Sequence, residues 1–224
     1  MLVELAAGTI EYTDSGGDGP VLMLLHGLMM DASLWDGVLS ELGGDFRCVV
    51  PVLPLGAHRV AMRADADLSL PGIARLVAEF CDRLELDDVT LVGNDTGGAL
   101  VQLLMADGLA SRAVLASCDA FDNFPPGLTG KTLVAAGRLS PAMFGLFMQQ
   151  LRVRAVRRLP IAFGWLTKRG DRVMPPEHGR RLAGLLPEAR LVEVADSYTL
   201  IPLYQPVRFA AILREFSEEL GRAR

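Results

Sequence analysis

Short apolar runs alternate along the chain with stretches of helical period, and clusters of glycine, proline and polar residues separate them. The run Val21–Leu25 is continuous, as in a central parallel strand buried on both faces, and the mainly apolar segments Phe46–Val50 and Val89–Val92 also predict strands. Apolar residues at every third or fourth position predict helices after Pro71 and over Val207–Leu220. Strands alternating with helices predict an α/β fold, an open and mostly parallel twisted sheet with helices on both faces.

The ends and the middle of the chain are less regular. Residues 2–13 alternate loosely and are followed by the turn-forming residues 14–20, which predicts an N-terminal hairpin. Further strands are expected at Ala113–Ala116 and Arg190–Val194. Residues 128–160 have a helical pattern and are rich in Met, Phe and Arg.

Length and composition restrict the class of protein. The 224 residues, 50% of them hydrophobic, fit a single domain over residues 1–224. The net charge of −5 gives no sign of a nucleic-acid surface, the first residues lack a signal-peptide pattern, and no apolar run is long enough to span a bilayer. The odd number of cysteines, three in apolar contexts, favours reduced thiols. We therefore expect a cytoplasmic protein with a small-molecule substrate, no metal or other cofactor, and no nucleic-acid or membrane partner, and a homodimer remains open.

The stretch Leu91–Leu100 predicts a strand, a sharp turn and a helix. The turn Gly93-Asn94-Asp95-Thr96-Gly97-Gly98 has the spacing G-x-D-x-G, which is the nucleophile-elbow spacing with Asp in place of the more usual Ser. Such a turn strains its central residue and needs glycine where side chains would collide. It would project Asp95 above the sheet at a helix N-terminus, where the dipole favours an anion. The alternative is that Asp95 only caps the helix.

Taken together, these features resemble the α/β-hydrolase family. The resemblance covers about residues 1–125 and 170–224. It is carried by five motifs, of which the first two follow a buried strand: Leu25-His26-Gly27, Trp35, the turn Gly93–Gly98, the loop Asp171-Arg172-Val173-Met174-Pro175-Pro176 and the segment Leu186-Pro187-Glu188-Ala189-Arg190.

The resemblance implies roles for individual residues. Asp95 matches the nucleophile, and an Asp there is similar to the haloalkane dehalogenase and epoxide hydrolase branch, where a carboxylate attacks carbon and leaves an ester. The backbone N–H groups of Thr96 and of Leu28, in the turn after Gly27, match the oxyanion hole. Asp171 matches the acid that orients the catalytic His.

Three departures from the family pattern concern the chemistry. By register Thr199 stands where the catalytic His is expected, Tyr198 replaces the preceding Gly, and no His follows His178. An aspartyl ester needs a base to activate water, and Thr is not such a base near neutral pH. Thr96 stands where dehalogenases typically have Trp, and no clear counterpart of the epoxide-opening tyrosine pair is present.

The chain is also short for the family. Residues 128–169 are interpreted as a remnant of the lid, so that the lid is reduced or missing. Either residues 161–166 form the next strand, or a segment is missing between Arg169 and Gly170, which is the favoured interpretation. The Met and Phe residues at 143–148 could line a lid or pack in a core, and the arginines at 152–158 could form a solvated face or bind an anionic substrate.

Several further residues are candidates for the pocket, each with a structural alternative. His26 more often supports the geometry of its turn, and Asp119 and Asp122 could instead cap a turn. Catalysis by His58 or His178 is a weaker alternative. The pocket candidates are His26, Asn94, Asp119, Asp122, Tyr198 and Thr199.

Three functional hypotheses follow. The first is a hydrolase that acts on a small apolar substrate through Asp95. The second is a non-hydrolytic enzyme of the same fold, a lyase, isomerase or cyclase, with Asp95 as general acid or base, which needs no deacylating His. The third is a catalytically inactive binding protein.

Overall fold

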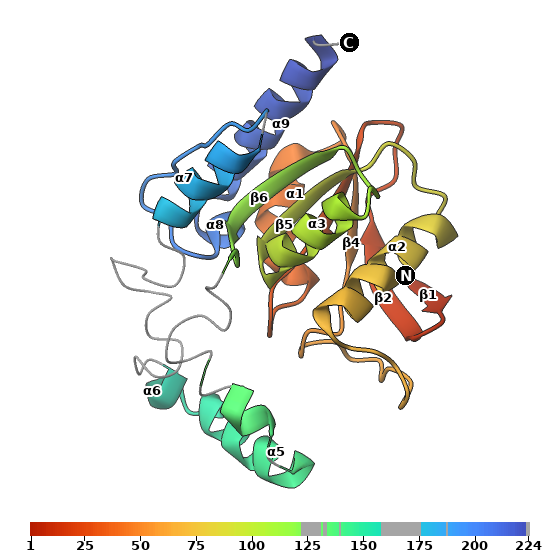
Figure 1. Ribbon diagram of the computed structural model, residues 1–224, viewed down its shortest axis with the longest axis vertical. Coiled ribbons are helices and arrows are strands. Elements are labelled where there is room, and N and C mark those ends of the chain that lie inside the picture. The colour runs from red at the N-terminus through yellow and green to blue at the C-terminus, as the bar shows by residue number, and fades with distance from the viewer. Residues whose placement is uncertain (122–130, 132–133, 139, 158–175, 187, 223–224) are drawn as a thin grey trace. The chain divides into compact units, whose positions relative to one another are not determined.

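The computed structural model describes residues 1–121, 131, 134–138, 140–157, 176–186 and 188–222 (Figure 1). The chain divides into two compact units. Met1–Cys118 and Leu200–Arg224 form the first, and Asp119–Thr199 form the second. We describe each unit separately.

The first unit contains a mixed sheet of six strands, which are in spatial order β1 (Leu2–Leu5), β2 (Gly8–Asp14), β4 (Arg47–Pro51), β3 (Val21–Leu25), β5 (Thr90–Asp95) and β6 (Arg112–Cys118). Parallel pairs join β3 to β4, β3 to β5 and β5 to β6, whereas the hairpin β1–β2 is antiparallel and β2 pairs antiparallel with β4. The predicted N-terminal hairpin and the central parallel strands are therefore confirmed.

Helices cover both faces of this sheet, and the alternation of side chains along the strands determines which layer each residue joins. Met23 and Leu25 of β3 pack with α2 (Leu70–Arg83) and α3 (Thr96–Ala106) in the main core. On the other face are η1 (Ala32–Trp35), α1 (Asp36–Leu42), α8 (Ile201–Tyr204) and α9 (Pro206–Arg222) (Figure 1). The rings of Trp35 and Phe209 lie 5.9 Å apart between centroids.

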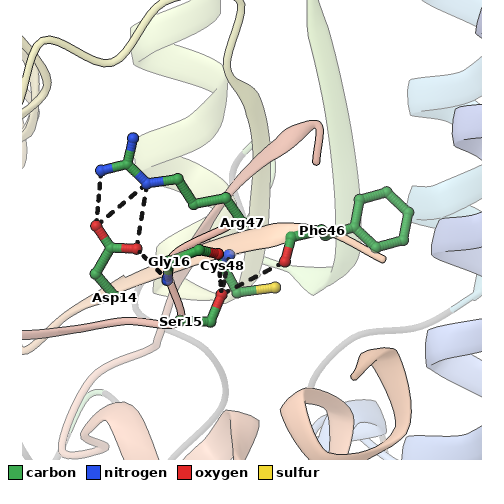
Figure 2. Close-up of polar contacts among 6 residues, drawn as sticks. All are labelled: Asp14, Ser15, Gly16, Phe46, Arg47 and Cys48. Carbon is green, nitrogen blue, oxygen red and sulfur yellow. Dashed lines mark hydrogen bonds and ion pairs between the residues drawn. The ribbon is translucent and has the colours of Figure 1, made fainter. Parts of the chain in front are cut away.

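Where β2 ends and β4 begins, polar side chains bond to one another and to the backbone (Figure 2). The Arg47 guanidinium donates to both carboxylate oxygens of Asp14, with Nη2 2.7 Å from Oδ2. Ser15 Oγ accepts a hydrogen bond from the Cys48 N–H at 2.8 Å. The ion pair lowers the pKa of Asp14 from its ordinary value. This network replaces hydrogen bonds that the strand ends would otherwise make to water.

The regular secondary structure in the described part of the second unit is helical. It contains α5 (Pro141–Gln149), η2 (Gln150–Arg152), α6 (Arg154–Arg157) and α7 (Pro176–Leu185). The strand predicted at Arg190–Val194 is wrong, because these residues have no regular structure and pair with none of the described strands. An apolar alternation alone does not make a strand when no neighbour supplies its hydrogen bonds. That residues 128–169 are a remnant lid, and that 1–224 is one domain, stay predictions.

None of the helices of the described residues is both long and apolar enough to cross a membrane. None of the His, Cys, Asp and Glu side chains of these residues form a group of three that could hold a metal ion.

Candidate active site

Asp95 lies at the junction of β5 and α3. It is the last residue of β5 and directly precedes the first residue of α3. Its backbone has φ 56° and ψ −127°, in the region that side chains other than glycine rarely adopt. Such a conformation costs on the order of 1–3 kcal/mol and persists only where the surroundings enforce it. The half-buried carboxylate of Asp95 is therefore held at the positive end of the α3 dipole.

Glycines around Asp95 leave the space that this turn needs. A Cβ on Gly27 would lie 2.3 Å from Asp95 Oδ2, and one on Gly93 would lie 2.5 Å from the Gly97 carbonyl oxygen. A Cβ on Gly97 would lie 2.2 Å from the Leu25 carbonyl oxygen. These distances are below any real Cβ contact, so the flanking glycines are required by close approach of the backbone rather than by positive φ.

The loop after β3 supplies a hydrogen-bond donor to the carboxylate. The backbone N–H of Leu28 donates to Asp95 Oδ2 at 3.2 Å. The next residue, Met29, has φ 60° and donates its N–H to the Leu55 carbonyl at 2.8 Å. The loop that follows β4 thus fixes the turn that presents the Leu28 donor.

His26 is fully buried and both of its ring nitrogens have partners. Nε2 accepts a hydrogen bond from the Leu53 N–H at 2.8 Å, so Nδ1, 2.9 Å from the Gly27 carbonyl oxygen, carries the proton and donates. Burial lowers the pKa of His26 and keeps this neutral tautomer. The ring ties the β4 loop to the turn before Leu28, which makes it a support of the site.

Asn94 and Thr96, on either side of Asp95, are buried. Asn94 Nδ2 donates to the Ala116 carbonyl at 2.7 Å and so joins β5 to β6 where the register shifts. This bond places the Asn94 amide in the sheet as a structural contact. Thr96 begins α3, where its backbone N–H is among the helix's terminal donors.

The structure thus brings together the turn residues and the oxyanion candidates of the first unit: His26, Leu28, Asn94, Asp95 and Thr96. Asp119, Tyr198 and Thr199 belong to the second unit, where Asp119 and Thr199 are buried and Tyr198 is half-buried. His178 also lies there, edge-on to the Phe121 ring at 6.1 Å between centroids. Asp122, Asp171 and the junction of Arg169 with Gly170 lie outside the described residues.

Sequence reasoning missed the support of the turn by the loop after β4. Leu53 and Leu55 act through their backbone, and no side-chain signal marks a backbone donor or acceptor. The only available signal was the turn-forming composition after Pro51. The described arrangement holds one carboxylate at the start of α3, with the Leu28 N–H donor bonded to it.

Comparisons with known proteins show the family to which this fold belongs. A profile described as the alpha/beta hydrolase family matches residues 22–214. The chain belongs to the alpha/beta hydrolase family. The thermophilic esterase from Thermogutta terrifontis, solved with malate bound, aligns over 98% of both chains with a TM-score of 0.72. Its sequence identity is 19%, so this likeness shows the fold alone.

Two dehalogenases are similar in sequence over part of the chain. The haloalkane dehalogenase of Mesorhizobium japonicum is 28% identical over 104 residues, 46% of this chain and 33% of that protein. Haloalkane dehalogenase 2 of Mycobacterium tuberculosis is 33% identical over 93 residues, 42% of this chain and 32% of that protein. The match therefore spans about a third of the length of each relative.

Proposed function

We propose that this protein is a hydrolase of the family in which Asp95 attacks an electrophilic carbon of a small, apolar substrate. The observation that carries the proposal is the strained backbone of Asp95, at φ 56°, together with the hydrogen bond from the Leu28 N–H to Oδ2. Strain of this kind is retained where it positions a group for chemistry. A simple helix cap has no need of it.

The dehalogenase relatives support an alkyl halide as the electrophile. A carboxylate oxygen of Asp95 forms a bond to carbon, the carbon–halogen bond breaks, and halide leaves with the electron pair. The oxygen that Leu28 holds becomes the carbonyl oxygen of an aspartyl ester. When water attacks that ester, charge develops on this oxygen, and the N–H groups of Leu28 and Thr96 stabilise it.

Hydrolysis of the ester is the slow half of the proposed cycle. His26 is committed to two hydrogen bonds, and Thr199 stands where the family resemblance expects the base. Without a general base, deacylation loses a factor of about 10²–10⁴. We therefore expect the ester to accumulate, with Asp171 left without its usual partner.

Halide release from a short 1-bromoalkane tests this proposal. We expect a burst of bromide that approaches one equivalent per chain, followed by a much slower phase. Asp95→Asn keeps the side-chain size and removes the nucleophile, so it abolishes the burst. A burst that persists in this variant rules out Asp95 as the nucleophile.

The substitution of Thr199 for the expected His also favours a second candidate. A lyase, isomerase or cyclase that uses Asp95 as general acid or base needs no deacylating His. This function predicts no bromide burst, together with turnover of a non-hydrolysable substrate that Asp95→Asn abolishes. A binding protein that kept the fold predicts neither.

A further inference from the structure

Charge is distributed unevenly along the chain. Every charged side chain between Asp122 and Asp171 is a lysine or an arginine, although the whole chain has a net charge of −5. The described part of this stretch contains Arg138, Arg152 and Arg154, all exposed. The stretch is therefore a basic segment in an otherwise acidic chain.

The helix between these arginines is apolar. No residue of α5, Pro141–Gln149, is charged, and Met143 and Leu146 are 56% and 72% exposed. Phe144 and Met148, one turn apart, are half-buried. Because positions three and four apart share a face, the two exposed side chains form one stripe and the two half-buried ones another. Exposed Val153 follows between Arg152 and Arg154.

An apolar stripe with cationic residues at both ends is the arrangement of a helix that lies in a membrane interface. The apolar side chains enter the boundary between headgroups and acyl chains, and arginines at the ends reach the anionic headgroups. A protein partner with a matching acidic and apolar patch would also satisfy the arginines. A lipid surface fits better because the stripe is flanked by cations without a single carboxylate from residue 123 to 170.

We propose that α5 and its flanking Arg138, Arg152 and Arg154 form a peripheral docking surface for anionic phospholipid. A peripheral contact of this kind departs from the expectation of no membrane partner, which rested on the lack of a spanning segment. The proposal is independent of Asp95 and of the reaction at the elbow.

Co-sedimentation of the full chain with lipid vesicles tests this surface. We expect binding to vesicles of mixed phosphatidylcholine and phosphatidylglycerol, weakening as salt is raised, and no binding to phosphatidylcholine alone. Arg152→Gln with Arg154→Gln should lower the partition coefficient about fivefold for each arginine. Leu146→Ser should lower it about tenfold, because it removes the most exposed apolar contact.

Matched variants separate this surface from a general effect of charge or fold. Arg180 and Leu185 lie on α7 of the same unit and are exposed, like the arginines and Leu146 of the proposed surface. Arg180→Gln and Leu185→Ser should therefore leave the partition coefficient unchanged. Arg152→Lys with Arg154→Lys keeps both charges and should bind like the parent. Equal binding to both vesicle types overturns the proposal, as does an unchanged partition coefficient in Leu146→Ser. Self-association in the absence of lipid that Leu146→Ser removes also overturns it, because the occupant is then a second copy.

Discussion

The two ends of the central parallel strands differ in how their residues are held. Hydrogen bonds and an ion pair hold the amino end, and a strained backbone holds the carboxyl end. At the amino end of β4, Arg47 pairs with Asp14 and Ser15 bonds the backbone of Cys48, and the one positive φ among the residues drawn there belongs to a glycine, Gly16 (Figure 2). At the carboxyl ends of β3 and β5, Met29 and Asp95 both have positive φ, and glycines approach carbonyl oxygens too closely for any side chain. The contacts at the amino end stabilise the sheet. The strained backbone at the carboxyl end lowers the stability of the fold and holds the Asp95 carboxylate in place.

The largest effect on the free energy of unfolding is expected at Gly97, beside the carboxyl ends of β3 and β5. Gly97→Ala would place a Cβ 2.2 Å from the Leu25 carbonyl oxygen, and neither backbone can move without disrupting the turn. We expect a loss of about 3 kcal/mol in the free energy of unfolding, measured by urea denaturation. Gly44→Ala, with nothing within 4 Å of the added Cβ, should change it by less than about 0.5 kcal/mol. Equal effects at the two sites would contradict the close-approach explanation.

The second largest effect on the free energy of unfolding is expected at Arg47, at the amino end of β4. Arg47→Met removes three hydrogen bonds to Asp14 and should cost about 2 kcal/mol in the same measurement. A double-mutant cycle with Asp14→Asn should give a coupling energy of about 1 kcal/mol. The matched pair Arg208–Glu215, with side chains 47% and 44% exposed, should couple by less than about 0.5 kcal/mol. Similar coupling in both pairs would show that the network adds nothing to the sheet.

A smaller effect of opposite sign is expected at Asp95. Asp95→Gly relieves the strain at φ 56° and should raise the free energy of unfolding by about 1 kcal/mol. The same substitution removes the carboxylate that the proposed reaction alkylates. The control is Asp107→Gly, because Asp107 has φ −82° after α3 and glycine there adds only backbone entropy to the unfolded chain. A loss of stability in Asp95→Gly as large as in Asp107→Gly would mean that the turn is not strained.

The smallest expected effect is on the pH dependence of stability. Burial lowers the pKa of His26 in the folded state. As pH falls below 6.5, the unfolded state therefore binds a proton that the folded state does not, and the free energy of unfolding falls. The ion pair lowers the pKa of Asp14, so its contribution is present above pH 3.8 and is lost as pH falls through the folded pKa. His26→Asn should remove the drop below pH 6.5 and leave the acidic one. Unfolding followed by fluorescence across pH measures both, and an unchanged drop in His26→Asn would contradict the assignment.

The sequence predicted most of the first unit because its signals are local. Mainly apolar segments marked β3, β4 and β5, and the glycine spacing marked the turn at Asp95. The contacts that fix this turn connect residues far apart in sequence, such as Leu53 with His26, and leave no pattern in either segment. The strand expected at 190–194 failed for the same reason, since pairing depends on a neighbour. The functional departure at Thr199 came from the family resemblance and stays a prediction.

The most direct test of the account is to locate the covalent adduct that the strained end is proposed to form. The full chain is incubated with a short 1-bromoalkane, and intact-mass and peptide mapping follow. We predict a mass gain of one alkyl group, placed on Asp95 as an ester and absent in Asp95→Asn. An unmodified Asp95 in a chain that still releases bromide, or an adduct that persists in Asp95→Asn, would contradict the account.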